Sequence, residues 1–147
     1  MTEDFYYLLN GQHIKKLCEI QFEELRKKYE LRQVELEILY YIGNSSALQI
    51  AREIVNNWNY SKSHVSKCID HLCSRGYLKT ITDSNDHRRV ILQVTKEGRE
   101  VIAQVSREKG KIAEILYDGV TPEEQEVLKK VFHKIQDNII KKLQNEK

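Results

Sequence analysis

The chain has 147 residues, of which 40% are hydrophobic and 31% are charged, and its formal net charge is +2. That length suffices for one domain with a hydrophobic core, and the composition is typical of a globular, helix-rich protein. No apolar run is long enough to span a membrane, and the start lacks the apolar stretch of a secretory signal. We therefore expect a cytoplasmic protein whose cysteines, Cys18, Cys68 and Cys73, are reduced thiols.

Residues 1–30 predict a long N-terminal helix. Its apolar positions recur at helical spacing, and Gly11 interrupts the pattern near its start. The apolar residues are Phe5, Leu8, Leu9, Leu17, Ile20 and Leu25.

A compact unit follows, beginning at residue 31. The segment Leu31–Ile42 alternates like a strand but also presents a helical face, and we choose the helix, with Gly43 as its C-terminal stop. A second helix is expected from about residue 47 to 56. A third begins after Ser61 as its N-cap, buries Val65, Ile69 and Leu72, and ends at Gly76.

The next segment, Lys79–Thr95, reads KTITDSNDHRRVILQVT and predicts a β-hairpin. Two runs rich in β-branched residues flank a polar turn. An acidic residue, an imidazole and two guanidiniums occupy the expected tip, at Asp86, His87, Arg88 and Arg89.

Two amphipathic helices are expected to close the chain. Thr95 is the expected cap of the first, which runs from about residue 96 to 117. Thr121, Pro122 and Glu124 supply the start of the second. Together with the N-terminal helix they carry more apolar surface than a small central unit can cover. We therefore expect a homodimer, with residues 1–30 and 99–147 as dimerisation helices around a lobe of residues 31–98.

Positive charge is concentrated in the central segment. Residues 59–96 hold seven Lys and Arg against three Asp, a net +4, while the remainder of the chain nets −2. A helix, a turn, a second helix and a β wing form the order of a winged helix-turn-helix, so we expect a mainly α fold with a small β-hairpin that binds double-stranded DNA. The expected major-groove residues are Ser61, Lys62, Ser63, His64, Ser66 and Lys67, and Asp86, His87, Arg88 and Arg89 form the wing, which is expected in the minor groove.

The run VSKCIDHLCSRGYLKTITDSNDHRRVILQVTKEG resembles the MarR family of bacterial transcriptional regulators. The resemblance implies an intertwined homodimer on pseudo-palindromic DNA, usually a repressor that small molecules, oxidants or metals release. It also implies that Arg88 enters the minor groove and that Asp86 orients it. Arg32 departs from the family pattern, because a Ser or Thr helix cap usually follows the leucine there.

Other functions are less well supported by the sequence. It holds no phosphate-cradling glycine loop, zincin motif or nucleophile elbow, so we expect neither an enzyme nor a cofactor. The spacing of His64, Cys68 and His71 permits a metal site, but we expect none, and we expect Cys18 to be a buried structural thiol. The alternative to a ligand-responsive repressor is a constitutive architectural DNA binder, or a protein-binding winged-helix module.

Overall fold

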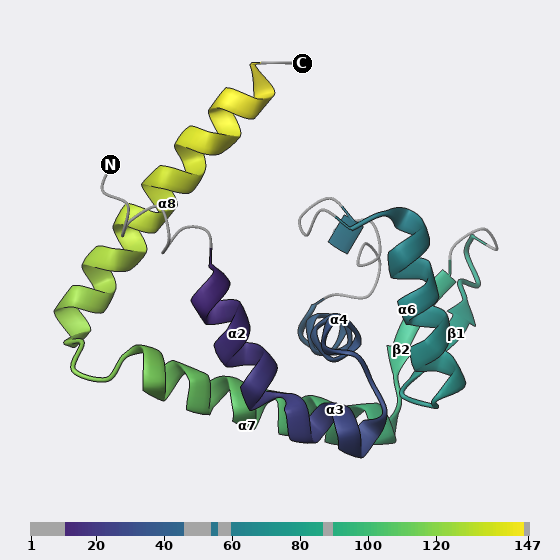
Figure 1. The fold of residues 1–147 in the computed structure, drawn as a ribbon. Helices are drawn as coiled ribbons and strands as arrows, with labels where there is room; N and C mark the ends of the chain where they lie inside the picture. The colour runs from purple at the N-terminus through teal and green to yellow at the C-terminus, as the bar shows by residue number, and fades with distance from the viewer. Residues whose placement is uncertain (1–10, 46–53, 56–59, 87–89, 146–147) are drawn as a thin grey trace. The chain divides into compact units, whose positions relative to one another are not determined.

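The computed structural model describes residues 11–45, 54–55, 60–86 and 90–145. The chain divides into two compact units, residues 1–112 and residues 113–147, which we treat separately. Figure 1 shows the helices and the single hairpin of the described part. The predicted mainly α fold with a small β-hairpin is confirmed.

In its described residues, the first unit contains the helices α2 (Gln12–Gln21), α3 (Glu23–Tyr29), α4 (Gln33–Asn44) and α6 (Lys62–Ser74), a two-stranded sheet and most of α7 (Lys96–Leu116). The strands are β1 (Leu78–Thr82) and β2 (Val90–Val94), and α7 follows them. Ile54 and Val55 are also helical, within the expected second helix of the lobe, whose other residues lie outside the described part.

The hairpin is antiparallel, with Leu78 opposite Val94 and Thr82 opposite Val90. Asp83 begins the turn, and its carboxylate Oδ1 accepts a hydrogen bond of 2.9 Å from the backbone N–H of Asn85. This Asx-type bond is a common way to stabilise a tight turn. Only Leu78 and Leu92 of the two strands are buried, and Val94 is partly buried against the core, while most of the other strand residues are exposed.

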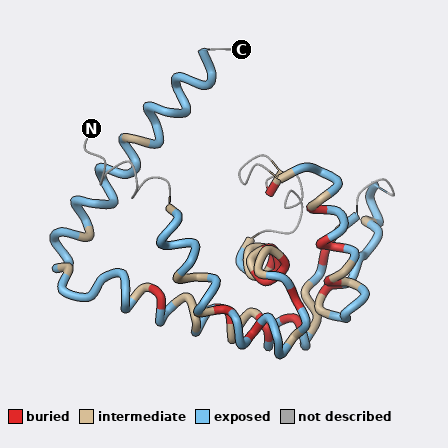
Figure 2. Tube along the Cα trace, in the orientation of Figure 1, coloured by how far each residue is buried: buried red, intermediate tan, exposed pale blue. Residues whose placement is uncertain are grey.

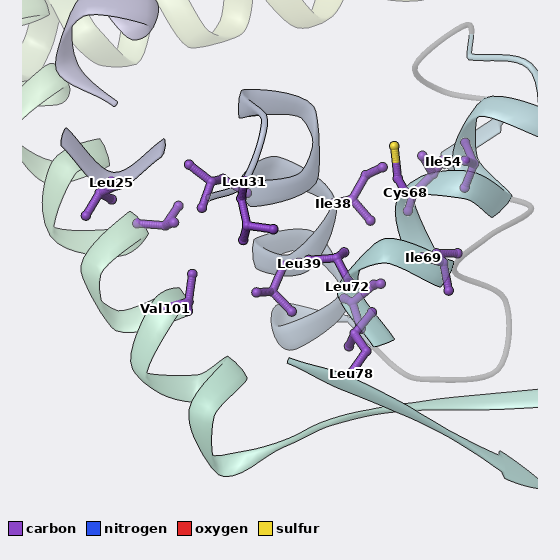
Figure 3. Close-up of a cluster of buried hydrophobic side chains, with 14 of the residues drawn as sticks. Leu25, Leu31, Ile38, Leu39, Ile54, Cys68, Ile69, Leu72, Leu78 and Val101 are labelled. Carbon is purple, nitrogen blue, oxygen red and sulfur yellow. The ribbon is translucent and has the colours of Figure 1, made fainter. Parts of the chain in front are cut away.

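One hydrophobic core joins the elements of the first unit (Figure 3). α4 contributes Leu36, Ile38 and Leu39, which are fully buried because the apolar positions recur every three to four residues. α4 also contributes Ile42. The core is completed from the rest of the first unit by Phe22, Leu25, Leu31, Ile54, Val65, Cys68, Ile69, Leu72, Leu78, Leu92, Val101, Val105 and Ile112. α4 and α6 are therefore held together by interdigitated side chains.

The N-terminal helical segment is more divided than the sequence suggested. Gly11 adopts a φ of 65° and α2 begins directly after it, as expected, but a second break at Phe22 separates α2 from α3. Phe22 and Leu25 are both buried in the core of the lobe. Part of the segment expected for dimerisation thus packs within its own chain.

Gly43 does not end α4, which continues to Asn44. A Cβ atom at Gly43 would lie 2.4 Å from Cδ1 of Ile102 on α7. The prediction of a glycine stop was therefore wrong at this position. The glycine instead permits close packing of α4 against α7.

The second unit consists of the end of α7 and α8 (Pro122–Gln144). Thr121 and Glu124 form the predicted capping box, with the Glu124 N–H 3.2 Å from Thr121 Oγ1 and the Thr121 N–H 2.8 Å from Glu124 Oε2. α8 has no buried residue in the single chain, and its trace in Figure 2 is pale blue with a few tan segments and no red. Among the described residues, none of the helices is sufficiently long and apolar to cross a membrane.

Candidate nucleic-acid interface

The N-terminal half of α6 presents a polar face to solvent. Ser61 caps the helix, accepting a hydrogen bond of 3.1 Å from the His64 N–H at its Oγ. Lys62, Ser63, Ser66 and Lys67 are all exposed. Backbone N–H groups, hydroxyls and ammonium groups are thus gathered at one helix end, which suits contact with phosphates and base edges.

The opposite face of α6 is anchored in the core. Val65, Cys68 and Leu72 are almost completely buried, and α6 packs against α4 and β1. The sequence predicted this division between an inward apolar face and an outward polar face. A helix held in this way can present short side chains at defined positions.

His64 differs from its exposed neighbours. Its ring stacks on Tyr60, with centroids 5.2 Å apart and an angle of 11° between the ring planes. Its Nε2 atom is buried and has no hydrogen-bond partner within the described part of the chain. His64 therefore lies at the edge of the polar face, and the stacked ring directs less of its surface to solvent than Ser63 or Lys67 does.

A buried carboxylate links α6 to the start of α4. Glu35 is 0% exposed, and its Oε1 accepts a bond of 2.8 Å from Arg32 Nη2 and another of 2.8 Å from His71 Nδ1. Its Oε2 accepts a third, also 2.8 Å, from the backbone N–H of Arg32. Burial pushes the pKa of Glu35 upward, but the bonds from Arg32 and His71 outweigh it, so the pKa lies below that of an ordinary glutamate.

This arrangement explains how an arginine can occupy the cap position of α4. A guanidinium has no acceptor for a helix N–H, so Arg32 cannot act as Ser or Thr would. Glu35 instead reaches back to the Arg32 N–H, which is the glutamate half of a capping box. The guanidinium then binds the same carboxylate and lies 3.6 Å from Cys68 Sγ.

Of the three cysteines, Cys68 is buried while Cys18 and Cys73 are only half-buried, so the prediction of a buried Cys18 was wrong. Burial raises the pKa of the Cys18, Cys68 and Cys73 thiols, and neighbouring carboxylates add to the effect. A raised pKa leaves little thiolate at neutral pH. Within the described ranges, no three His, Cys, Asp or Glu side chains gather at one point as a metal site would require.

Thr95 fixes the base of the wing through hydrogen bonds with nearby backbone groups. Thr95 Oγ1 donates a hydrogen bond of 2.7 Å to the Gly76 carbonyl oxygen. The Thr95 N–H donates a second one, of 3.1 Å, to the carbonyl oxygen of Tyr77. The same Oγ1 accepts 3.0 Å from the Gly98 N–H, which makes Thr95 the cap of α7, as predicted. The ring of Tyr77 meets that of Tyr29 edge to face, with centroids 6.1 Å apart.

Arg75 adds an ionic contact between the end of α6 and the end of α3. Its Nη2 lies 2.7 Å from Glu30 Oε2 and 3.3 Å from the carbonyl oxygen of Tyr29. The guanidinium of Arg75 is therefore paired within the protein, although Arg75 belongs to the positively charged segment of residues 59–96.

The predicted wing tip lies mostly outside the described residues. Asp86 is exposed at the end of the turn, while His87, Arg88 and Arg89 fall between described segments. Ser61, Lys62, Ser63, Ser66 and Lys67 are brought together on α6 as predicted. The pairing of Asp86 with Arg88 and the contacts of the tip stay predictions.

Sequence reasoning missed the Glu35 cluster. The signal was present, because Arg32 and Glu35 have the spacing of a cap residue and its capping-box glutamate. His71 could not be paired with Glu35 from the sequence, since the two residues are 36 positions apart.

Comparisons with known proteins agree with this geometry. The family model described as a winged helix DNA-binding domain matches residues 31–98. The HTH-type transcriptional regulator SarU of Staphylococcus aureus is 34% identical over 92 residues, which cover 61% of this chain and 37% of SarU. The chain therefore matches little more than a third of the length of that relative.

Solved structures share the fold. A MarR protein from Peptoclostridium difficile superimposes with a TM-score of 0.79 at 23% identity, over 100% of this chain and 95% of that one. A structure described as a putative MarR family regulator from Listeria monocytogenes, complexed with 26mer DNA, has a TM-score of 0.78 at 19% identity. That match covers 95% of this chain and 90% of the other.

Proposed function

Because this chain is a winged helix protein with the MarR fold, we propose that it is a transcriptional regulator that binds double-stranded DNA in a sequence-specific manner. The observation that carries the proposal is the polar face of α6. Lys62, Ser63, Ser66 and Lys67 are exposed there, while the reverse face is locked in the core. The Listeria monocytogenes protein with this fold was solved with DNA, which supports the same partner for this chain.

In this proposal the first half of α6 lies in the major groove. Ser63, Ser66 and Lys67 contact base edges, and Ser61 and Lys62 contact phosphates near the helix N-terminus. The wing residues Asp86, His87, Arg88 and Arg89 follow the neighbouring minor groove, where arginine is favoured by the negative potential.

A homodimer would place two such lobes on a pseudo-palindromic operator. α8 supports this step, because its apolar stripe is uncovered in the single chain: Val127, Val131, Phe132 and Ile139 are 60%, 45%, 56% and 54% exposed. An apolar surface of this kind on a helix usually marks an interface. A second copy, with the same stripe, is the partner that the proposal names.

The proposed regulator is a repressor that releases DNA when a small molecule binds. A redox signal through the cysteines is less favoured, because burial raises the pKa of all three thiols. A coupling of about 1–3 kcal/mol between ligand and DNA binding would change operator affinity by about 5- to 150-fold.

The test is selection of bound duplexes from a random DNA pool, followed by footprinting on the selected sequence. Protection of a palindrome over two half-sites is the expected result. Weak binding that is indifferent to sequence would contradict the proposal and favour an architectural DNA binder, and no DNA binding would favour a protein-binding module. Repeating the assay with phenolic acids, peroxides and divalent metals tests release of the selected duplex.

A further inference from the structure

Glu35 is a buried charge that neither the core nor the DNA-facing surface requires. Of the charged residues that the structure describes, it alone is buried. A buried carboxylate costs several kcal/mol of desolvation, and an apolar side chain of similar volume is often at least as stabilising. Its presence therefore needs an explanation beyond stability.

Its bonds supply one, because they join two helices with directional contacts. Both bonds from Arg32 lie within the start of α4, whereas the bond from His71 Nδ1 crosses to α6. An ionised carboxylate only accepts, so Nδ1 of His71 is the donor in this bond. His71 is one helical turn after Lys67, on the helix that carries the proposed base-contacting residues.

Apart from the long contact of 3.6 Å between Arg32 Nη2 and Cys68 Sγ, the remaining contacts between the described residues of α4 and α6 are apolar and do not define a rotation as sharply. Val65, Cys68 and Leu72 can adjust by small shifts against Leu36 and its neighbours, whereas a hydrogen bond weakens steeply when its angle or length changes. A rotation of α6 about its axis would move Ser63 and Lys67 relative to DNA. The same rotation would break the bond to Glu35.

We propose that Glu35 and His71 are positioning residues that fix the rotation of α6 on α4 and thereby determine how well the protein discriminates between DNA sequences. This inference rests on the proposed function, since it assigns α6 to sequence reading. Arg32 has a supporting part: its two bonds hold the carboxylate at the start of α4 whether or not His71 is present.

The decisive variants change His71 and leave the cap of α4 intact. His71→Leu removes the donor, and His71→Asn restores one, because the amide nitrogen of asparagine lies near the place of Nδ1. Ser74→Ala is the control on the same helix: it removes an exposed hydroxyl that donates a hydrogen bond of 2.8 Å to the His71 carbonyl oxygen.

The first measurement is the affinity ratio for two duplexes. One is the duplex that the wild-type protein selects from a random pool, and the other has the same composition in scrambled order. His71→Leu should lower the ratio about tenfold, a factor close to the lower end of the range expected for a hydrogen bond to a charged group. His71→Asn should recover most of that loss, and Ser74→Ala should match the wild type.

The ratio separates positioning from other effects. General loss of folded protein, or loss of a polar ring near DNA, lowers the affinity for both duplexes alike and leaves the ratio unchanged. An unchanged ratio in His71→Leu would overturn the inference, as would a His71→Asn variant that discriminates no better than His71→Leu.

The second measurement needs no DNA. Amide hydrogen exchange in the free protein should become faster along α6 in His71→Leu, while α4 keeps its protection because Arg32 and Glu35 still cap it. If the amides of α6 exchanged equally fast in the wild type and in His71→Leu, the proposal that His71 fixes α6 on α4 would be overturned. If the wild type selected no sequence, the discrimination role would fall with the proposed function, and the exchange rates would still decide whether His71 holds α6.

Discussion

The backbone of Tyr77 lies directly against Gly98. A Cβ atom at Gly98 would be 2.2 Å from the Tyr77 carbonyl oxygen and 2.9 Å from Cγ1 of Val94. The same carbonyl oxygen accepts the N–H of Thr95 at 3.1 Å. The first turn of α7 therefore touches the entry to the wing, and the absence of a side chain at Gly98 permits the contact.

Gly98→Ala should destabilise the protein. In an exposed helix interior the change would be favourable by up to about 1 kcal/mol, because alanine has the higher helix propensity. Here the new methyl group overlaps backbone that cannot move without breaking the Thr95 bond, and overpacking of this kind costs about 1–3 kcal/mol. Urea unfolding monitored by circular dichroism measures the net change.

Gly110→Ala is the matched control for that prediction. Gly110 lies in the same helix, α7, and a Cβ atom there would meet no atom within 4 Å. This variant should be as stable as the wild type or more stable. Equal destabilisation of both variants would show that the Tyr77 contact is not the cause.

The contribution of Glu35 to stability should depend on pH. Its pKa is lower in the folded protein than the ordinary value of 4.5, so the unfolded chain binds the proton more readily. The stabilisation is therefore complete above the unfolded pKa and is lost as the pH falls through the folded pKa. Wild type should exceed Glu35→Gln by about 1–3 kcal/mol at pH 7, and the gap should narrow below pH of about 4.

Urea titrations of both proteins at a series of pH values from 7 to 3 check this expectation. Glu23→Gln is the control, since its carboxylate is paired only with exposed Lys27 on the helix surface. A gap between wild type and Glu35→Gln that stayed constant with pH would show that the charge of Glu35 contributes nothing.

Much of the fold followed from local patterns in the sequence. The caps at Ser61, Thr95 and Thr121, and the division of α6 into buried and exposed faces, all depend on residues within a few positions of one another. Such contacts are determined by helical geometry and by the hydrogen-bonding needs of helix ends.

The features that the sequence did not reveal depend on contacts between distant residues. Gly43 looked like a helix stop because its neighbour Ile102 is 59 positions away in the chain. The break at Phe22 depends on the position of the core that receives its side chain. The bond between His71 and Glu35 likewise exists only after α4 and α6 have packed.

A dimer should form through the apolar stripe of α8. Light scattering at micromolar protein is expected to return twice the chain mass of 17.4 kDa. Phe132→Asp places a charge within the stripe, where Phe132 is 56% exposed in the single chain, and should shift the mass toward the monomer. Removal of residues 137–147 should weaken both dimerisation and DNA affinity, because the two half-sites would no longer be linked.

Lys130→Asp provides the control for the dimer prediction. It also places an aspartate on α8, at an exposed position on the side that faces away from the centre of the stripe. It changes the net charge by two units, where Phe132→Asp changes it by one, so it is the more severe electrostatic change of the two. Its mass should stay that of the wild type. A wild-type mass near 17.4 kDa would contradict the proposed homodimer.

The exposed residues of α6 should control sequence choice. Ser63→Ala or Lys67→Ala should cost about 1–3 kcal/mol on the selected duplex, because each removes a proposed contact to a base edge. The preference should relax at one position in each half-site. Repeating the selection with each variant measures this, and an unchanged preferred sequence would exclude a base contact by that residue.

Arg88 should contribute to DNA binding in a different way. In the minor groove, readout is largely limited to A·T against G·C and to groove width, so Arg88→Ala should weaken binding at every site, most at those with A·T-rich flanks. The loss of one cation per subunit, two per dimer, should reduce the slope of log affinity against log salt by about two units. Asp86→Ala should produce a milder form of the same change if the carboxylate holds the guanidinium in one orientation before binding.

Titration of the variants against the selected and scrambled duplexes at two salt concentrations tests this prediction. Arg99→Ala is the control, because it removes an equal charge from an exposed position on α7 outside the proposed interface. If Arg88→Ala bound like Arg99→Ala, the hairpin would not act as a DNA wing. The expected result is that Arg88→Ala loses more DNA affinity than Arg99→Ala on both duplexes and has the smaller salt slope. That result would place the hairpin tip in the minor groove and leave the choice of sequence to α6.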